Sequence, residues 1–273
     1  QAIIPDATVM LNCTNGNFRQ GYCEIRKIGA PNLITLYGMP SACGLKQLSP
    51  FVVKVEMALI YLGLEYEVEH ISPLKVRSLS PTGKVPWIRM GKSTLSESDS
   101  IIAFLNGNQD GDLFNGLTND QRVLGMALKR LTEDHLYWLM VWAKRISDTS
   151  RAALAESLLD QYPRPVRMVI SAVTKRRISA MCKTQGIGLM SADERGKEAV
   201  KDLTALSDQL EKMPFLLGPD ITVYDFSVAA MLSSILFFKP TNWLSDMAKN
   251  HEVFPEYLAR VSDRRGDYEF IQD

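Results

Sequence analysis

The chain has 273 residues, 46% of them hydrophobic, and its 31 basic side chains equal its 31 acidic ones. This length allows one large domain or two small ones, and the zero net charge argues against a nucleic-acid-binding protein. No apolar run is long enough to cross a bilayer, so we expect a cytoplasmic protein without a membrane span. The four cysteines and three histidines lack metal-ligand spacing, and we therefore expect no metal site and no disulfide scaffold.

The first 32 residues are rich in Asn, Gly and Thr, and only Ala7–Leu11 resembles a strand. We interpret residues 1–32 as an N-terminal extension that packs on the surface or is partly mobile. Cys13 and Cys23 could pair within it, although two free thiols are the favoured interpretation.

Strand and helix patterns then alternate. Leu33–Tyr37 is apolar and β-branched, which predicts a strand. After a loop rich in Gly, Pro and Ser, Val52–Leu62 shows the apolar spacing of a helix, with Ser49 at its N-cap and Pro50 at its first position. Glu65–Ile71 alternates as a second strand.

The stretch Ser80–Ser98 predicts two short strands joined by a tight turn, followed by a helix. The Val85-Pro86 bond is of the type that can be cis, and a cis bond would leave the Val85 N–H and C=O free to pair with a peptide-like ligand. Ser98 opens the helix, whose free N–H groups favour a carboxylate, and Glu97 offers a charge to an ammonium. Gamma-glutamyl peptides carry this set of groups.

Two motifs in this stretch, Ser-Pro-Thr-Gly-Lys-Val-Pro and Leu-Ser-Glu-Ser, together resemble the glutathione-binding half of the glutathione transferase superfamily. The resemblance implies that the proline loop pairs with the cysteinyl backbone of glutathione and that the acidic-Ser pair holds its gamma-glutamyl end. Lys84 could reach the glycyl carboxylate or could be a solvated turn residue. The implied glutathione site consists of Lys84, Val85, Pro86, Glu97 and Ser98.

The second half of the chain is predicted to be helical. A glycine-rich linker at residues 108–117 separates the first domain, residues 33–107, from a helical domain at residues 118–273. Capping boxes and prolines delimit its helices. We expect long helices from Thr118 to about Ser147, from Val166 to Thr184, from Ser191 to near Lys212, and from Phe226 to Phe238.

Three stretches of this half, Glu133–Trp142, Gln185–Gly188 and Asp202–Ser207, resemble the failed-axon-connections branch of the superfamily, which is related to metaxins. The resemblance implies an α+β thioredoxin-like N-terminal domain followed by an all-α C-terminal domain. Thr222 and Asp225 match a Thr-x-x-Asp cap that recurs on a buried helix in transferases, and we interpret them as structural.

Ser49 is the candidate catalytic residue, because a hydroxyl at the N-terminus of the first helix can stabilise a bound thiolate; a plain helix cap is the alternative. Tyr37 matches the catalytic tyrosine of other transferase classes, although core packing is favoured. Cys43 in the preceding loop would instead support thiol exchange. We place these last two beside a possible co-substrate pocket with three aromatic residues at helical spacing, which are more often core: Tyr137, Trp138 and Trp142.

His135 beside Asp134 is interpreted as a structural histidine. The run Lys175–Arg177 is either a solvated helix face or lines the cleft for an anionic co-substrate.

We therefore predict a homodimeric glutathione transferase that activates glutathione as a thiolate for attack on a small electrophile. The alternatives are a non-enzymatic adaptor with the same fold and a Cys43-dependent thiol-exchange reductase.

Overall fold

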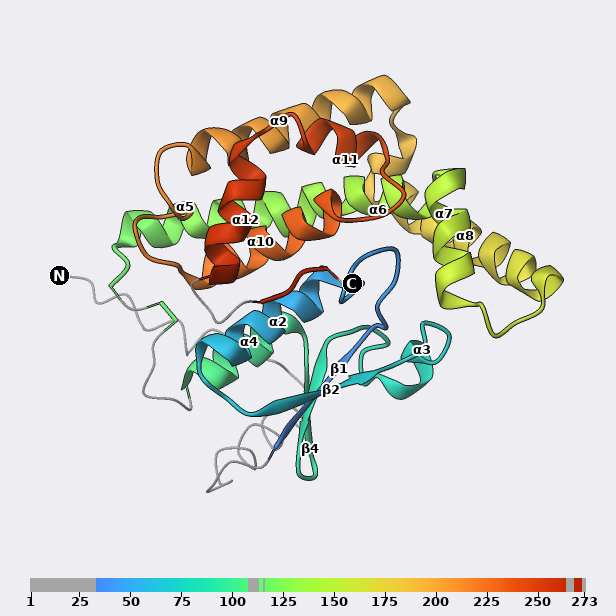
Figure 1. The fold of residues 1–273 in the computed structure, drawn as a ribbon, viewed down its shortest axis with the longest axis horizontal. Coiled ribbons are helices and arrows are strands. Elements are labelled where there is room, and N and C mark those ends of the chain that lie inside the picture. The colour runs from blue at the N-terminus through green and yellow to red at the C-terminus, as the bar shows by residue number, and fades with distance from the viewer. Residues whose placement is uncertain (1–32, 108–112, 115, 264–267, 272–273) are drawn as a thin grey trace.

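The computed structural model describes residues 33–107, 113–114, 116–263 and 268–271. The predictions for the N-terminal extension, including Cys13 and Cys23, and most of the predicted linker fall outside these residues. The described chain forms a small sheet with its helices, and a larger helical domain packed against it (Figure 1).

The sheet has four strands in the order β2-β1-β3-β4. Strand β1 is parallel to β2 and antiparallel to β3, and β4 is antiparallel to β3. The strands are β1 Ile34–Gly38, β2 Tyr66–His70, β3 Trp87–Met90 and β4 Ser93–Ser96. Its helices are α2 Pro50–Tyr61, α3 Val76–Leu79 and α4 Ser98–Gly107. This order of elements confirms the predicted thioredoxin-like domain.

The two faces of the sheet have separate cores. Leu36, Ile88 and Leu95 belong to the main core, which they share with α2 and α4. Tyr37 and Trp87 belong to a smaller cluster on the side of α3. This alternation is the period-2 pattern of strands that are covered on both faces.

The strand register brings several segments to one edge of the sheet. Tyr37 near the end of β1 pairs with Trp87 at the start of β3, and Trp87 pairs with Ser96 at the end of β4. Directly after β1, the N–H of Met39 donates to Oε1 of Gln47 at 2.8 Å, close to the start of α2. The loop before α2, the residues before β3 and the residues after β4 therefore meet at this edge.

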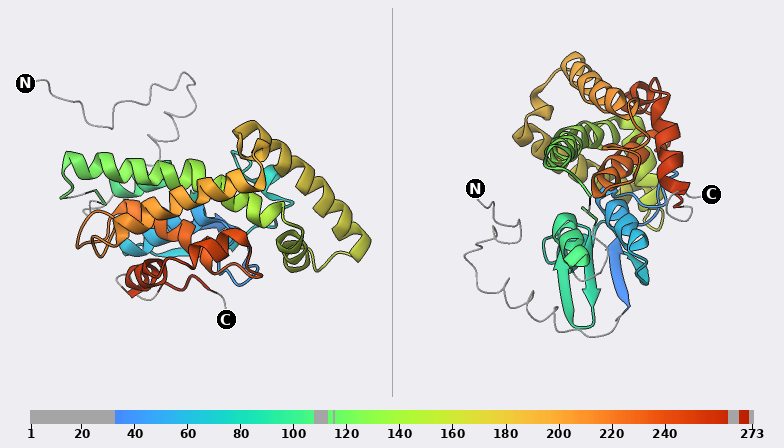
Figure 2. Two further views of the ribbon diagram at one scale, coloured as in Figure 1. Left: turned by 90° about the horizontal axis from the view of Figure 1, so that it is seen from above. Right: turned by 90° about the vertical axis from the view of Figure 1, so that its left-hand side faces the viewer.

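The second domain is helical, as predicted, and Figure 2 shows it stacked on the helix-covered face of the sheet. A π-helical turn, Leu131–Leu136, interrupts the long helix predicted to begin at Thr118. A 3-10 turn, Ile187–Leu189, follows α8. The helices are α5 Asn119–Arg130, α6 Tyr137–Arg145, α7 Asp148–Leu158, α8 Arg164–Gln185, α9 Ala192–Leu210, α10 Val223–Leu236, α11 Trp243–Ala248 and α12 Val253–Asp263.

Helix α10 is buried along its whole length and packs against α2, so it joins the two domains. Its first turn is held by Asp225, which is 0% exposed. The carboxylate accepts hydrogen bonds from the N–H and hydroxyl of Thr222, the N–H of Leu216 and the hydroxyl of Tyr257, all at 2.8–2.9 Å. The structural role predicted for Thr222 and Asp225 is confirmed.

Buried charges also connect the domains. Nζ of Lys54 on α2 lies 2.5 Å from Asp99 on α4 and 2.7 Å from Glu133 in the π-helical turn. Lys129 on α5 donates to Asp99 as well. The C-terminal segment adds one more contact, because the hydroxyl of Tyr268 donates to the buried carboxylate of Glu56 at 2.7 Å.

Candidate active site

Ser49 is the N-cap of α2, and its side chain makes no capping hydrogen bond. Its carbonyl accepts from the N–H groups of Val52 and Val53, as expected at a helix start. A capping serine normally uses its hydroxyl to satisfy one of these N–H groups. The Ser49 hydroxyl is therefore available to another partner, at the positive end of the helix.

The Val85-Pro86 peptide bond is cis, as the sequence predicted. In the described part of the chain, the backbone N–H and C=O of Val85 have no hydrogen-bond partner. The turn before them is held by Ser80, whose hydroxyl accepts from the N–H of Lys84 and donates to its carbonyl. The Lys84 side chain is exposed.

Glu97 and Ser98 lie at the junction of β4 and α4. Glu97 is exposed and has a φ of +72°, in the left-handed region that non-glycine residues rarely adopt. Its carbonyl accepts from the N–H of Ile101 at 2.9 Å, so α4 begins here. Ser98 is 8% exposed and lies in the first turn, where N–H groups lack helical partners. The junction thus combines an exposed carboxylate with an anion-favouring helix start.

The strand register places Val85, Pro86, Glu97 and Ser98 at one edge of the sheet. The Met39–Gln47 hydrogen bond brings the loop that ends at Ser49 to the same edge. A sequence-distant ion pair supports this arrangement, because Lys54 in α2 contacts Asp99, the residue after Ser98. Sequence reasoning did not find this pair; an acidic residue in a first helical turn was visible, but its partner is 45 positions away.

The backbone of Tyr37 is at this edge, but its side chain lies on the α3 side of the sheet. Its ring stacks on Trp87 with centroids 4.6 Å apart and planes 6° apart, in the cluster on the α3 side of the sheet. Burial raises the pKa of its hydroxyl, with Glu69 adding to the effect. Both observations favour core packing over a role in thiol activation.

Cys43 sits in a tight turn closed by two backbone hydrogen bonds between Ala42 and Leu45. Cys43 and Gly44 both have positive φ, the geometry of a primed turn. Burial raises the pKa of the thiol, although Lys144 and Arg145 oppose this shift. A raised pKa disfavours the thiolate that thiol exchange requires.

The three aromatic residues predicted beside a co-substrate pocket, Tyr137, Trp138 and Trp142, lie in two different surroundings. Tyr137 packs edge-to-face on Phe51 in the first turn of α2, and Trp138 packs on Tyr137, so these rings approach the edge that holds Ser49. Trp142 instead lies under the guanidinium of Arg195, 4.1 Å from the ring centroid.

His135 is paired with Asp202 on α9, with its Nδ1 2.6 Å from the carboxylate. This pairing agrees with a structural histidine.

A hollow is lined by residues of both domains. It has a volume of about 60 Å³, and its lining includes Pro73 and Leu74 of the first domain together with Arg145, Arg151 and Lys175 of the second. The run Lys175–Arg177 was the only signal for it in the sequence.

Within the described residues, no cluster of three or more His, Cys, Asp or Glu side chains is arranged to hold a metal ion. In the same residues, every helix is too short or too polar to span a membrane.

Comparisons with known proteins agree with this geometry. The family model described as the glutathione S-transferase N-terminal domain matches residues 50–150. The isoprene-epoxide glutathione S-transferase of Rhodococcus sp. (strain AD45) is 30% identical over 233 residues, which cover 84% of this chain and 98% of the relative. Failed axon connections of Drosophila melanogaster is 30% identical over 214 residues, which cover 75% of this chain and 50% of the relative.

More distant similarities are found to metaxin-2 in sequence and to a solved structure in fold. Human metaxin-2 is 24% identical over 185 residues, which cover 67% of this chain and 70% of the relative. The crystal structure of the β-etherase LigF from Sphingobium sp. strain SYK-6 has a TM-score of 0.58 at 16% identity, and covers 84% of this chain and 94% of its own. The chain therefore belongs to the glutathione transferase superfamily.

Proposed function

We propose that this protein is a glutathione transferase that activates glutathione as a thiolate for attack on a small electrophile. The observation that carries the proposal is the uncommitted hydroxyl of Ser49 at the sheet edge that also presents Val85 and the Glu97–Ser98 junction. If Ser49 served only as a helix cap, its hydroxyl would accept a hydrogen bond from an N–H group in the first turn of α2, and it does not.

In this assignment the Val85 N–H and C=O pair with the cysteinyl backbone of glutathione. The first turn of α4 and the Ser98 hydroxyl hold the gamma-glutamyl carboxylate, and Glu97 faces its ammonium. Lys84 is exposed in the turn that Ser80 holds, directly before Val85, and it is the candidate partner for the glycyl carboxylate.

The reaction follows from this geometry. The thiol proton leaves to solvent on binding, and the sulfur lone pair forms a carbon–sulfur bond with the electrophile. The electron pair of the broken bond departs with a leaving group such as chloride, or stays on an epoxide oxygen that then takes up a proton. Ser49 donates a hydrogen bond to the thiolate and takes no part in covalent chemistry.

The size of the Ser49 effect can be estimated. A free thiol has a pKa of about 8.5, so only a few per cent is thiolate at neutral pH. A hydrogen bond to a charged acceptor contributes about 1.5–3 kcal/mol, which lowers the thiol pKa by about one to two units. The helix N-terminus adds about 0.3–1 kcal/mol. The hydroxyl is therefore the larger contribution.

The test is an ultraviolet titration of bound glutathione thiolate in wild type and in Ser49→Ala, with binding measured by calorimetry. We expect Ser49→Ala to bind glutathione but to titrate about one to two pH units higher. The control is Ser41→Ala, a loop serine before the turn at Cys43, which should titrate as wild type. If wild type and Ser49→Ala titrate at the same pH, Ser49 does not lower the thiol pKa and is only the N-cap of α2. If wild type does not bind glutathione, the proposed function is rejected.

A non-enzymatic adaptor with the same fold is the second candidate, because Failed axon connections, whose name describes no transferase activity, is also 30% identical to this chain. An adaptor has no need for a glutathione site, so the same calorimetry separates the two functions. The Cys43 reductase is disfavoured by the raised pKa of that thiol.

We also propose that the enzyme acts as a cytoplasmic homodimer. Helix α5 exposes Val123, Leu124 and Met126, and Val123 is 70% exposed. Apolar side chains grouped on one exposed helix are typical of an interface. Sedimentation velocity should show twice the 30.6 kDa mass of one chain.

A further inference from the structure

Arg145, at the end of α6, is a partly buried cation without a counter-charge in the described chain. No carboxylate or hydrogen-bond acceptor within the described chain is paired with it. Burial lowers the pKa of its guanidinium, and only Tyr137 and Cys43 oppose the shift. A guanidinium cannot escape this cost by losing its proton, because arginine stays charged in proteins.

The adjacent residue shows how the fold treats a cation that needs no ligand. Lys144 is buried, and its Nζ donates to the hydroxyl of Ser234 at 2.6 Å and lies over the ring of Phe238. Burial lowers the pKa of Lys144 well below its ordinary value, so the amine can lose its proton. Arg145 has neither arrangement, and its charge remains free for an anion.

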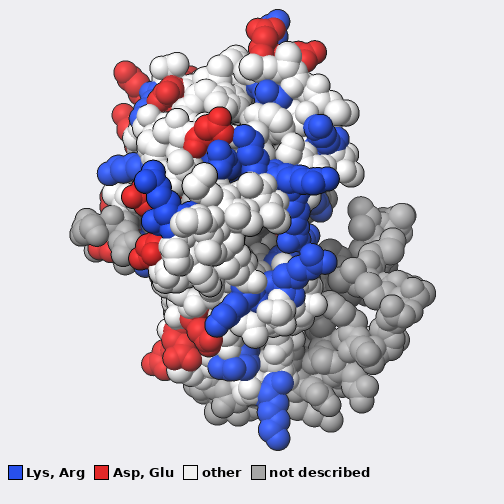
Figure 3. Space-filling view, turned by 90° about the vertical axis from the view of Figure 1, so that its right-hand side faces the viewer, with Lys and Arg blue, Asp and Glu red and all other residues white. Residues whose placement is uncertain are grey.

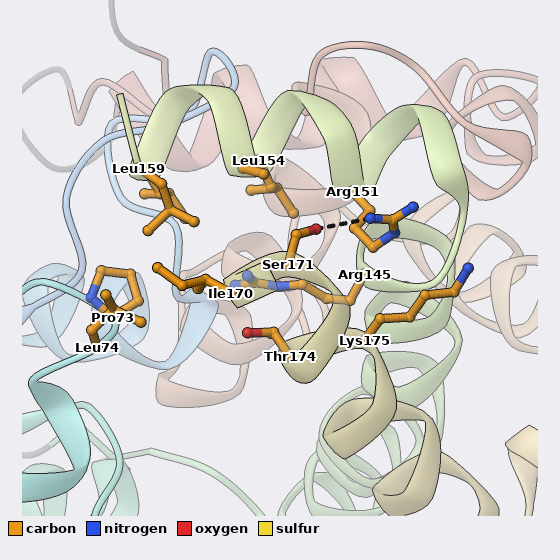
Figure 4. A pocket seen from close by; sticks show the side chains of 12 residues that line it. Pro73, Leu74, Arg145, Arg151, Leu154, Leu159, Ile170, Ser171, Thr174 and Lys175 are labelled. Atoms are coloured by element: carbon orange, nitrogen blue, oxygen red, sulfur yellow. Dashed lines mark hydrogen bonds between the residues drawn. The ribbon is translucent and has the colours of Figure 1, made fainter. Parts of the chain in front are cut away.

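Arg145 lies in the hollow between the domains. Figure 4 shows its side chain extended across the pocket between Leu154 of α7 and Thr174 of α8. The volume of about 60 Å³ is several times the roughly 10–15 Å³ that one water needs, so a carboxylate fits. Leu154, Ile170 and Leu74 line the same space with apolar surface.

The other cations of the hollow are partly neutralised. Asp148 pairs with Nη2 of Arg151 at 2.8 Å and with Nζ of Lys175 at 3.0 Å. Nη1 of Arg151 donates to Ser171, but its Nε is buried without a partner. The hollow is therefore lined by three cations, Arg145, Arg151 and Lys175, and only Asp148 neutralises them. The Nε of Arg151 and the whole guanidinium of Arg145 have no partner in the described chain.

The surface around the hollow is basic although the whole chain is neutral. Helix α8 carries six Lys and Arg residues and no Asp or Glu. Figure 3 shows Lys and Arg side chains gathered on this face, around a recess in the surface. Such a field raises the local concentration of anions and their rate of entry.

We infer that the second substrate is a small electrophile with an apolar body and an anionic group, a carboxylate in the simplest case, and that Arg145 binds this group in the hollow. The inference rests on the proposed function, because it names the substrate class of that reaction. The hollow is connected to the proposed site through the first domain: Pro73 and Leu74 follow Ile71, whose N–H donates to the carbonyl of Gly38 at the end of β1.

The experiment compares two aryl chlorides of similar shape, 4-chloro-3,5-dinitrobenzoate and the neutral 4-chloro-3,5-dinitrobenzamide, and each kcat/KM is divided by the uncatalysed rate constant of that chloride with glutathione. In both, the glutathione sulfur bonds to the ring carbon and chloride leaves with the bonding pair. Wild type should prefer the benzoate in kcat/KM, and Arg145→Met should reduce that preference at least about tenfold. The matched control is Arg176→Met, an exposed arginine on α8 outside the hollow, which should keep the preference at physiological salt.

Two binding measurements separate the explanations. The first is calorimetry with 3,5-dinitrobenzoate, which has no leaving group and cannot react. Its binding should weaken at least about tenfold in Arg145→Met and persist in Arg176→Met. The second is glutathione affinity, which should be equal in wild type and Arg145→Met. A tenfold loss there would show that Arg145 holds the glycyl carboxylate of glutathione, and would overturn the inference.

The remaining outcomes distinguish the two proposals. Conjugation with an unchanged benzoate preference in Arg145→Met would overturn the anion site and leave the transferase function intact. Arg145-dependent binding of 3,5-dinitrobenzoate without any conjugation would reject the transferase function and retain the anion site.

Discussion

Two ionisable side chains in this protein, Asp225 and Arg145, have opposite surroundings. Asp225, at the start of α10, accepts hydrogen bonds from Thr222, Leu216 and Tyr257. Arg145, at the end of α6, has no such partner in the described chain, and it faces a hollow. Asp225 is fully buried and Arg145 is partly buried, and an ionisable group that is withdrawn from water without partners is costly.

The difference separates structural from binding roles. A charge whose donors and acceptors are all supplied by the chain stabilises the fold, and removing it leaves those partners unpaired. A charge without partners costs stability in the absence of ligand, and is explained by a ligand that completes it. The comparison predicts opposite responses of stability and binding to substitution at the two positions.

The largest effect is expected from Asp225→Ala. It removes the cap of a fully buried helix that joins the domains, and leaves several buried donors unpaired. We expect the free energy of unfolding to fall by at least about 3 kcal/mol, measured by urea denaturation. Tyr257→Phe removes one donor and should cost about 1–2 kcal/mol. If Asp225→Ala and wild type have similar free energies of unfolding, the Asp225 hydrogen bonds do not stabilise the fold.

Asp99 is an intermediate case, because its side chain is 50% exposed yet contacts Lys54 and Lys129. Burial would raise its pKa, but the two lysines outweigh this and lower the pKa to about 2. A lowered pKa in the folded state means that the stabilisation is present above about pH 4 and is lost as the pH falls toward 2.

We therefore expect wild type to lose more stability than Asp99→Asn between pH 4 and pH 2.5, by about 1 kcal/mol or less because solvent screens the exposed side. Urea denaturation at the two pH values measures the difference. Equal acid sensitivity would mean that the Asp99 ion pairs add nothing to the domain contact.

The smallest effect on stability is expected from Arg145→Met. The substitution removes an unpaired, partly buried charge and puts an apolar side chain in its place, so the free energy of unfolding should stay within about 1 kcal/mol of wild type or rise. Urea denaturation without ligand tests this. A fall in the free energy of unfolding of more than about 2 kcal/mol would show that Arg145 stabilises the fold, as Asp225 does.

Local patterns in the sequence predicted much of the fold. The capping boxes at Thr118 and Ser191 are present, because each needs only residues three positions apart. Strands β1 and β2 lie within one residue of their predicted limits, and β3 and β4 lie within the stretch that was predicted to hold two short strands. The π-helical turn, α7, α11 and α12 were not predicted. Helix α11 has only six residues, whereas α12 carries buried apolar residues at helical spacing, a pattern that the sequence did offer.

The sequence alone determined the thioredoxin-like order of elements, the cis Val85-Pro86 bond and the identity of the residues at the proposed glutathione site, because these depend on neighbours along the chain. Only the tertiary structure decided which charges are satisfied. Lys54 meets Glu133 across 79 positions, Glu56 meets Tyr268 across 212, and Arg145 meets no carboxylate in the described chain. The physical reason is that the free energy of a buried charge depends on what packs around it, and in this fold those neighbours come from distant segments.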